Sequence, residues 1–323
     1  MGGPLRWEDD ATAALEQLRL TPDFGEGGAA ERHAGAFASA LLEKSCGRTP
    51  PDVLGSLMAL ASSEYLGDSE ATVKFCAGLR RFAETACGGD LLAGSLNPSR
   101  VSEVMGRVPS QDVRKLVCGL VSALVSRNHS DADTALAFVA PLASTVGDPE
   151  EAIGVADAAG DALCAVAERL NALSDAAALG RLAATLADLA TGDGTSAGSV
   201  NLRALDVAFR VATTSEAACS APAMLEVVTR AAGALRAFAH DDPAAAAGVL
   251  EVLASPLVGD GRGLREGAPR GGPPRAASLL SPARPTLATM VGDGSLGDAI
   301  RARCAWLLDA WEAAAEAPAG RTV

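Results

Sequence analysis

An apolar residue recurs every three or four positions along most of this chain, and this spacing predicts α-helices. The clearest case follows Pro109. Seven apolar residues there fall at positions i, i+3, i+4, i+7, i+8, i+11 and i+12: Val113, Leu116, Val117, Leu120, Val121, Leu124 and Val125. A helix with 3.6 residues per turn places all of them on one side. The segment is therefore predicted to be an amphipathic helix that packs against other helices.

Similar apolar stripes, separated by short turns rich in Gly, Asp or Pro, continue along the chain, and no segment predicts a strand. Upstream of Pro109, helices are predicted near 8–20, 30–46, 50–65, 69–87 and 98–108. Downstream, they are predicted at 130–147, 148–173, 174–191, 202–209, 225–239, 243–253 and about 295–316. Ser, Asp and Pro stand at many of the predicted starts, where they cap the first turn.

The rhythm of helices and turns predicts the fold class. Short turns make successive helices antiparallel, and two helices with their turns occupy about 40–45 residues. Hydrophobic residues make up 49% of the chain but aromatic residues only 3%, a composition of Ala, Leu and Val that suits close helix packing and disfavours sheets. The sequence resembles the HEAT/armadillo superfamily over most of its length. It therefore predicts an all-α fold, a right-handed superhelical array of antiparallel helix pairs.

One segment interrupts the rhythm and sets the predicted domain organisation. A helical repeat array is predicted over 1–256, a flexible Gly/Pro/Arg-rich loop over 257–285, and a C-terminal capping helix with a tail over 286–323. The loop carries five arginines and two acidic residues. It is either a plain insertion between helices or a basic, phosphorylatable segment that contacts a partner. The residues of this second reading are Arg262, Arg265, Arg270, Arg275, Ser278, Ser281 and Arg284.

Charge and cysteine usage restrict the expected partners and location. The formal net charge is −13, which disfavours binding to nucleic acid or to an anionic membrane surface and suits a basic protein partner. No run of about 18 apolar residues predicts a membrane span, and no signal-peptide pattern opens the sequence. The seven cysteines are scattered and never spaced C-x-x-C. They are predicted to be small buried side chains in a reducing compartment, so the expected location is cytoplasmic and/or nuclear.

Two short motifs match sequence signatures of cofactor-binding or catalytic sites. Residues 292–297 match G-x-G-x-x-G, but a dinucleotide site also needs a preceding strand and a following βαβ unit, so a turn into the last helix is predicted. Residues 131–134 spell D-x-D-x-T, the nucleophile motif of haloacid-dehalogenase-like phosphatases. That motif belongs at the end of a buried strand. Asp131 and Asp133 are instead predicted to cap a helix start.

No other pattern indicates catalysis or a cofactor. The histidines His33, His129 and His240 are far apart, and none has a partner at i+3 or i+4. Neither H-E-x-x-H, nor a Cys/His cluster, nor a G-x-S-x-G elbow occurs. The chain is therefore predicted not to be an enzyme and to need no metal or cofactor.

The residues Val108 to Leu116 are similar to helix starts in the central repeats of importin-β-like karyopherins of the transportin/importin branch. This resemblance implies a nuclear transport receptor, or a fragment of one, that releases cargo when Ran-GTP binds. The broader hypothesis is a non-catalytic scaffold that binds protein partners along its groove. The alternatives are an assembly factor or chaperone for a large complex, and a phosphotransfer enzyme that uses Asp131 and Asp133.

Overall fold

The described residues form helices joined by short turns. The computed structural model describes residues 6–21, 28–45, 69–93, 96, 98–107, 110–126, 131–191, 200–258 and 274–316, and no strand occurs among them. The chain divides into two compact units, Met1–Arg169 and Leu170–Val323. None of the described helices is both long and apolar enough to cross a membrane. The predicted all-α class is confirmed, whereas the single array predicted over 1–256 and its superhelical hand stay predictions.

Most of the helices predicted for the N-terminal unit occur in the structure. Its helices are α1 (Arg6–Leu20), α2 (Ala29–Ser45), α4 (Ser69–Glu84), α5 (Ala86–Ala93), α6 (Pro98–Arg107), α7 (Gln111–Ser126), α8 (Ala132–Ala137), α9 (Val139–Gly147) and α10, which spans Ile153–Ala172 and ends just beyond the unit's boundary. The helix predicted near 50–65 lies outside the described residues.

The C-terminal unit continues with helices of similar lengths. They are α11 (Ala176–Thr191), α12 (Leu202–Thr214), α13 (Glu216–Cys219), α14 (Pro222–Asp241), α15 (Pro243–Val258), α16 (Pro274–Leu280), the 3-10 helix η2 (Ser281–Ala283), α17 (Arg284–Gly292) and α18 (Asp298–Ala315). Side chains cap several starts: Asp175 accepts a hydrogen bond from the Ala178 amide, and Asn201 accepts one from the Ala204 amide.

Four groups of described helices share one order, a short helix followed by two longer ones. This order holds for α5–α6–α7 and α8–α9–α10 in the N-terminal unit, and for α13–α14–α15 and α16–α17–α18 in the C-terminal unit. The predicted repeat is thus confirmed, but each repeated group has three helices. The first helix of each group has four to eight residues, too few to show a clear apolar stripe in the sequence.

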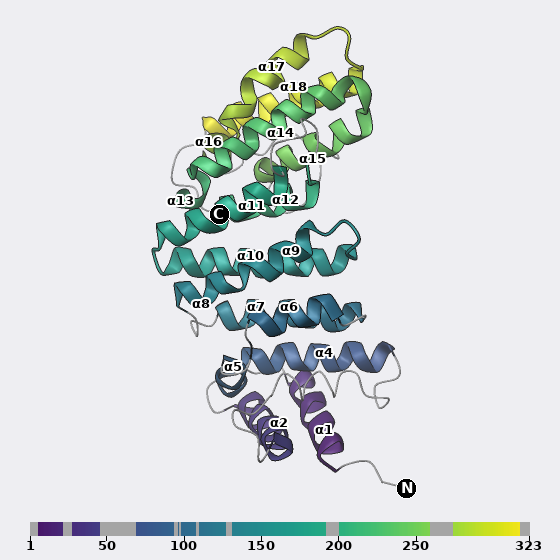
Figure 1. Ribbon diagram of the computed structural model, residues 1–323, viewed down its shortest axis with the longest axis vertical. Helices are drawn as coiled ribbons and strands as arrows, with labels where there is room; N and C mark the ends of the chain where they lie inside the picture. The colour runs from purple at the N-terminus through teal and green to yellow at the C-terminus, as the bar shows by residue number, and fades with distance from the viewer. Residues whose placement is uncertain are drawn as a thin grey trace. The chain divides into compact units, whose positions relative to one another are not determined.

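Corresponding helices of successive groups pack side by side. In the N-terminal unit, α4 packs on α1 and α7 packs on α4, while α9 packs on α6 (Figure 1). In the C-terminal unit, α12, α15 and α18 form one layer, and α11, α14 and α17 form the other. Each unit therefore consists of two helix layers with the apolar core between them.

Apolar side chains of these helices fill the core as the sequence predicted. All seven residues of the stripe Val113 to Val125 are buried, and so is Cys118. Phe82 of α4 meets Phe37 of α2 edge to face, with ring centroids 4.9 Å apart and an angle of 82° between the rings. Both phenylalanines are fully buried.

The helix predicted over 130–147 is interrupted at Phe138, which separates α8 from α9. The physical cause is Pro141. Proline has no amide hydrogen to donate to the carbonyl four residues earlier, that of Ala137, and its ring crowds that carbonyl. The bend buries both Phe138 and Pro141 in the core.

The next helix was predicted to begin at Asp148, but α10 begins at Ile153. Asp148 Oδ1 accepts a hydrogen bond from the Glu150 amide at 2.9 Å, which stabilises a turn and does not cap a helix. Glu151 then accepts from the Ala152 amide and pairs with Arg114, which holds residues 149–152 outside the helix.

The prediction of a flexible loop over 257–285 is wrong for its first two and its last twelve residues. Residues 257 and 258 end α15, and residues 274–285 belong to α16, η2 and the start of α17. Residues 259–273 lie outside the described part. Pro282 and Pro285 occupy first-turn positions of η2 and α17, where a missing amide hydrogen costs nothing. The apolar residues of this segment are buried: Ala276, Ala277, Leu279, Leu280 and Ala283. They provide the apolar face that the prediction overlooked.

Candidate protein-binding surface

Three successive helices of one layer present a surface of segregated charge in the N-terminal unit. We call it the α4–α7–α10 face. It consists of Arg80 on α4, of Lys115, Gly119, Ser122 and Ser126 on α7, and of Gly154, Asp157, Asp161 and Glu168 on α10. On α7 and α10 these residues recur at intervals of three, four or seven, so each set lies on one side of its helix.

Each basic side chain of this face lies across a glycine of the next helix. A Cβ atom added at Gly119 would lie 3.2 Å from Arg80 Nε, and one added at Gly154 would lie 2.8 Å from Lys115 Cε. The glycines therefore leave room for the long side chains to extend over the neighbouring helix, with their apolar stems covered and their charges at the surface.

Arg80 and Lys115 form no ion pair with any carboxylate that the structure describes. Arg80 is exposed and Lys115 is half-buried. The sequence of this unit holds 24 acidic and 14 basic residues, so these two surface cations lie in a mostly acidic environment.

The same face carries the opposite charge on α10. Asp157, Asp161 and Glu168 are all exposed, and Asp157 and Glu168 have no ion-pair partner among the described residues. Ile153, the first residue of the helix, is 66% exposed, one of the few large apolar side chains so open in the described chain. The exposed side of α10 thus offers carboxylates at helical spacing beside one apolar contact.

A buried ion pair joins α7 to the turn before α10. Arg114 Nη1 lies 2.8 Å from Glu151 Oε2, and the side chains are 18% and 6% exposed. Burial, with a smaller contribution from the negative charge of Glu151, raises the pKa of the nearby Cys118 thiol to about 12. These groups are structural, since the paired charges face each other and the thiol stays protonated near neutral pH.

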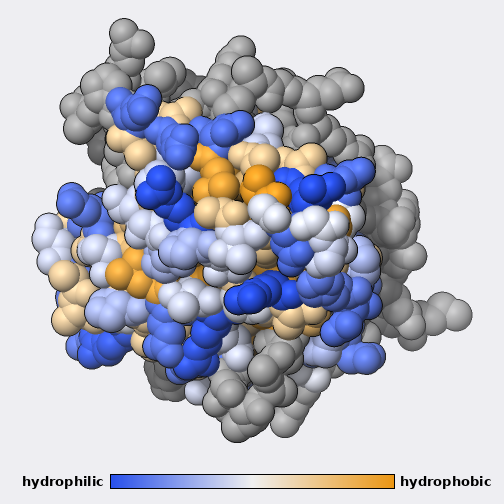
Figure 2. Space-filling view, turned by 90° about the horizontal axis from the view of Figure 1, so that it is seen from above, coloured by the Kyte–Doolittle hydropathy of each residue, from blue (hydrophilic) through white to orange (hydrophobic). Residues whose placement is uncertain are grey.

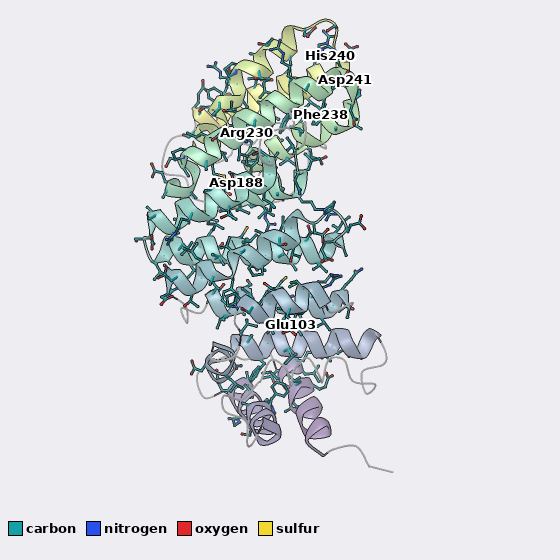
Figure 3. All side chains as sticks on the ribbon, in the orientation of Figure 1. Glu103, Asp188, Arg230, Phe238, His240 and Asp241 are labelled. Atoms are coloured by element: carbon teal, nitrogen blue, oxygen red, sulfur yellow. The ribbon has the colours of Figure 1, made fainter. Side chains whose placement is uncertain are left out.

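A second cluster of titratable groups lies in the C-terminal unit, where His240 and Asp241 end α14 (Figure 3). His240 Nε2 lies 4.0 Å from Asp293 Oδ2, and both side chains are about half exposed. Hydrogen bonds from Ser295 hold the pKa of Asp293 below its usual value, with His240 and Arg236 contributing less. This arrangement is a solvated surface contact between α14 and the turn that follows α17.

The predicted partner residues are only partly within the described chain. Arg262, Arg265 and Arg270 lie outside it, and Arg275 belongs to α16, but its side chain is not described. Ser278, on α16, and Ser281, the first residue of η2, are both exposed. The structure therefore places two serines of this set at the surface and does not test the binding role of any member.

Arg284 is the one predicted arginine whose side-chain contacts the structure describes. Its guanidinium carbon lies 4.7 Å from the centroid of the Trp311 ring, and its Nη2 lies 3.6 Å from Glu312 Oε1. Trp311 Nε1 donates a hydrogen bond of 2.7 Å to the Ala277 carbonyl. Trp311 therefore links α18 to both α16 and α17.

The surface at the α17–α18 end of the C-terminal unit shows no extended apolar area (Figure 2). Figure 2 looks onto that end, where apolar residues form small separate areas between hydrophilic ones. Single apolar residues at a surface are ordinary in soluble and partner-binding proteins alike.

Both short motifs lie where the sequence analysis placed them, at helix ends. Asp131 is the N-cap of α8, and its Oδ1 accepts a hydrogen bond of 2.8 Å from the Thr134 amide. Gly292 ends α17 and Gly297 is the N-cap of α18. The prediction that these residues form caps and turns is confirmed.

The cysteines and histidines provide no metal site in the part of the chain that the structure describes. There, no group of three or more His, Cys, Asp or Glu side chains is arranged to hold a metal ion. Cys118, Cys219 and Cys304 are buried free thiols, as predicted, and Cys164 is half-buried. The prediction that the chain is not an enzyme remains a prediction.

Sequence reasoning missed the α4–α7–α10 face. The four-residue and seven-residue intervals from Asp157 to Asp161 and Glu168 are visible in the sequence and identify an acidic side of α10. The contacts of Arg80 with Gly119 and of Lys115 with Gly154 join residues far apart in the chain, so no sequence signal predicted them.

Comparison with known proteins adds little to this picture. No protein-family model matches the chain, and no curated protein matches it. An engineered protein of known structure aligns at 14% identity over 94% of this chain and 68% of its own, with a TM-score of 0.36. A designed armadillo repeat protein aligns at 13% identity over 93% of this chain and 99% of its own, with a TM-score of 0.30. Likenesses this low do not bear on function, and the fold assignment rests on the helices described above.

Proposed function

We propose that this protein is a non-catalytic scaffold that binds an extended segment of a partner protein across the α4–α7–α10 face. The observation that carries the proposal is the separation of charge on that face. On this face, Arg80 of α4 and Lys115 of α7 are basic, and Asp157, Asp161 and Glu168 of α10 are acidic. A stacked-helix fold with charges of opposite sign on successive helices is suited to binding several positions of one partner chain.

The partner that fits is a segment with a basic stretch. Its basic residues would contact the carboxylates of α10, and an apolar residue would cover Ile153. The net charge of the chain, −13, supports this choice because it attracts a basic partner over long distances and speeds association. The α7 side chains between the two charged groups are small, so the backbone of the partner can approach closely there.

A charge-matched pair of variants tests the proposal. The face variant combines Asp157→Asn, Asp161→Asn and Glu168→Gln. The control variant combines Glu251→Gln, Asp309→Asn and Glu316→Gln, three exposed residues of the C-terminal unit, and so changes the net charge equally. The probes are fluorescent 15-residue peptides of basic, neutral and acidic composition, measured against the full chain by anisotropy over a series of salt concentrations.

We expect the basic peptide to bind the unmodified chain and the control variant, and to bind the face variant about tenfold more weakly at low salt. Equal affinity for all three proteins would contradict the proposal. Equal weakening by both variants would also contradict it, because the binding would then reflect overall charge. Cross-linking with mass spectrometry should place the bound peptide on α10.

The finer functional hypotheses from the sequence remain proposals within this one. A nuclear transport receptor would release its bound segment on addition of Ran-GTP, whereas a scaffold or assembly factor would not respond to the nucleotide. The buried free thiols Cys118, Cys219 and Cys304 support the proposed cytoplasmic and/or nuclear location, since they suit a reducing compartment. Fluorescence microscopy of the tagged chain would test it.

A further inference from the structure

Four Ser-Pro or Thr-Pro pairs occur in the sequence, and one of them stands apart. They begin at Thr21, Thr49, Ser255 and Ser281. Only the last is followed, three residues later, by a basic residue, Arg284. Ser281 is also exposed, whereas Ser255 is half-buried in α15, donates its hydroxyl to the Val252 carbonyl at 2.9 Å and precedes a buried proline.

The surroundings of Ser281 contain a cation that can reach it. Residues 274–292 form a continuous run of helical segments, α16, η2 and α17. Ala277, Ser281 and Arg284 follow one another at intervals of four and three, so they lie on the same side of this run. Trp311 of α18 contacts two residues of this run, the Ala277 main-chain carbonyl and the Arg284 guanidinium.

Arg284 is held loosely enough to change partners. Its side chain is 53% exposed, and its ion pair with Glu312, itself 56% exposed, is 3.6 Å long. A solvated pair of this length contributes little stability. The contact with the face of Trp311 leaves the edges of the guanidinium, with their donors, available for another acceptor.

We propose that Ser281 is a phosphorylation site for a proline-directed protein kinase and that its phosphate pairs with Arg284. In the reaction, the Ser281 hydroxyl oxygen forms a bond to the γ-phosphorus of ATP, the bond from that phosphorus to the bridging oxygen breaks, ADP leaves and the hydroxyl proton is released. The product carries nearly two negative charges and three strong acceptor oxygens, which an arginine three residues later on a helix can bind. The phosphate then competes with Glu312 for the guanidinium of Arg284.

The first test is phosphorylation of the full chain. We expect a proline-directed serine/threonine kinase with ATP to modify Ser281, as mapped by mass spectrometry, and Ser281→Ala to abolish that product. Ser255 and Ser278 serve as internal controls, since one is half-buried and the other is not followed by proline. Modification of Ser281 no faster than that of Ser255 would overturn the assignment of the site.

The second test isolates the pairing with Arg284. Phosphoserine is installed at position 281 by genetic-code expansion, in the unmodified chain and in Arg284→Gln. Circular dichroism confirms that these two proteins and their unphosphorylated counterparts are helical. We expect the phosphate to raise the melting temperature when Arg284 is present and to lower it in Arg284→Gln, where no guanidinium at position 284 balances its charge. High salt should shrink both shifts. The same shift in both backgrounds would show that Arg284 does not bind the phosphate and would overturn the pairing.

Discussion

Arg114 and Glu151 form an ion pair that joins α7 to the turn before α10, with 2.8 Å between Nη1 and Oε2 and little of either side chain exposed. Glu151→Ala leaves the arginine without a partner in the core. We expect the free energy of unfolding to fall by about 3 kcal/mol, because a buried charge that loses its partner is costly. Urea denaturation measures the change. Glu150→Ala, at the exposed neighbouring position, is the control and should change stability by less than about 0.5 kcal/mol.

Two glycines should respond to the same substitution in opposite directions. A Cβ atom at Gly88 would lie 1.9 Å from the Phe82 carbonyl oxygen, which belongs to the backbone and cannot move aside. Gly88→Ala should therefore destabilise the chain by about 1–3 kcal/mol or more. Gly180, inside α11, has no atom within 4 Å of its added Cβ, so Gly180→Ala should stabilise by up to about 1 kcal/mol. Thermal unfolding of both variants checks the two signs, and a shared sign would contradict the packing described.

Phe82 is the central aromatic residue of the N-terminal core. Phe82→Ala removes the edge-to-face contact with Phe37 and opens a cavity, so we expect a loss of about 3–5 kcal/mol. Leu20→Ala is the comparison, because Leu20 is 59% exposed and should matter little. Guanidinium denaturation distinguishes the two. Comparable effects of both substitutions would mean that Phe82 is not buried as described.

The buried thiols predict a loss of stability at alkaline pH. Burial raises the pKa of Cys118 from 9.0 to about 12 and that of Cys304 from 9.0 to about 11. Above pH 9 the unfolded thiols ionise while the folded ones stay protonated, so stability is full below pH 9 and falls as the pH rises further. The slope is about 1.4 kcal/mol per pH unit for each thiol. Urea midpoints from pH 8 to 10.5 should therefore fall less steeply in a Cys118→Ala, Cys304→Ala variant than in the unmodified chain.

Substitutions at Asp131 and Asp133 distinguish a helix-capping role from a role in phosphotransfer. Hydrogen bonds from the Thr134 side chain and amide hold the pKa of Asp131 below its usual value. Asp131→Asn should therefore lower stability near neutral pH, and the difference from the unmodified chain should vanish as acid protonates Asp131. Asp133, in the first turn but not the N-cap, should matter less. Hydrolysis of an aryl phosphate that depended on either residue would revive the phosphatase hypothesis.

Much of the fold follows from local sequence signals. The stripe from Val113 to Val125 specifies both a helix and its buried side, because its period is that of the helix itself. The break at Phe138 was also accessible in principle, since Pro141 cannot complete the hydrogen bond to Ala137. The late start of α10 could not be predicted from local sequence. It depends on the pairing of Glu151 with Arg114, and these residues are far apart in the chain.

The segment before α17 shows the limit of composition as a guide. Prolines and glycines across 257–285 predicted a loop, yet the five apolar residues between Pro274 and Arg284 are buried in the C-terminal unit. Packing against α14 and α18 decides the structure of so short a stretch. The binding face was beyond sequence reasoning for a similar reason, since Arg80 meets Gly119 only after α4 and α7 have packed.

Arg80, Lys115 and Asp157 stand on three successive helices of one layer, so neighbours on the surface are separated in the gene by about one repeat. Duplication or loss of one group of three helices would add or remove one contact position and leave the rest of the layer in register. A change of partner in such a protein can therefore arise by inheritance of whole units, and relatives with different partners should differ first in the residues that cross the glycines.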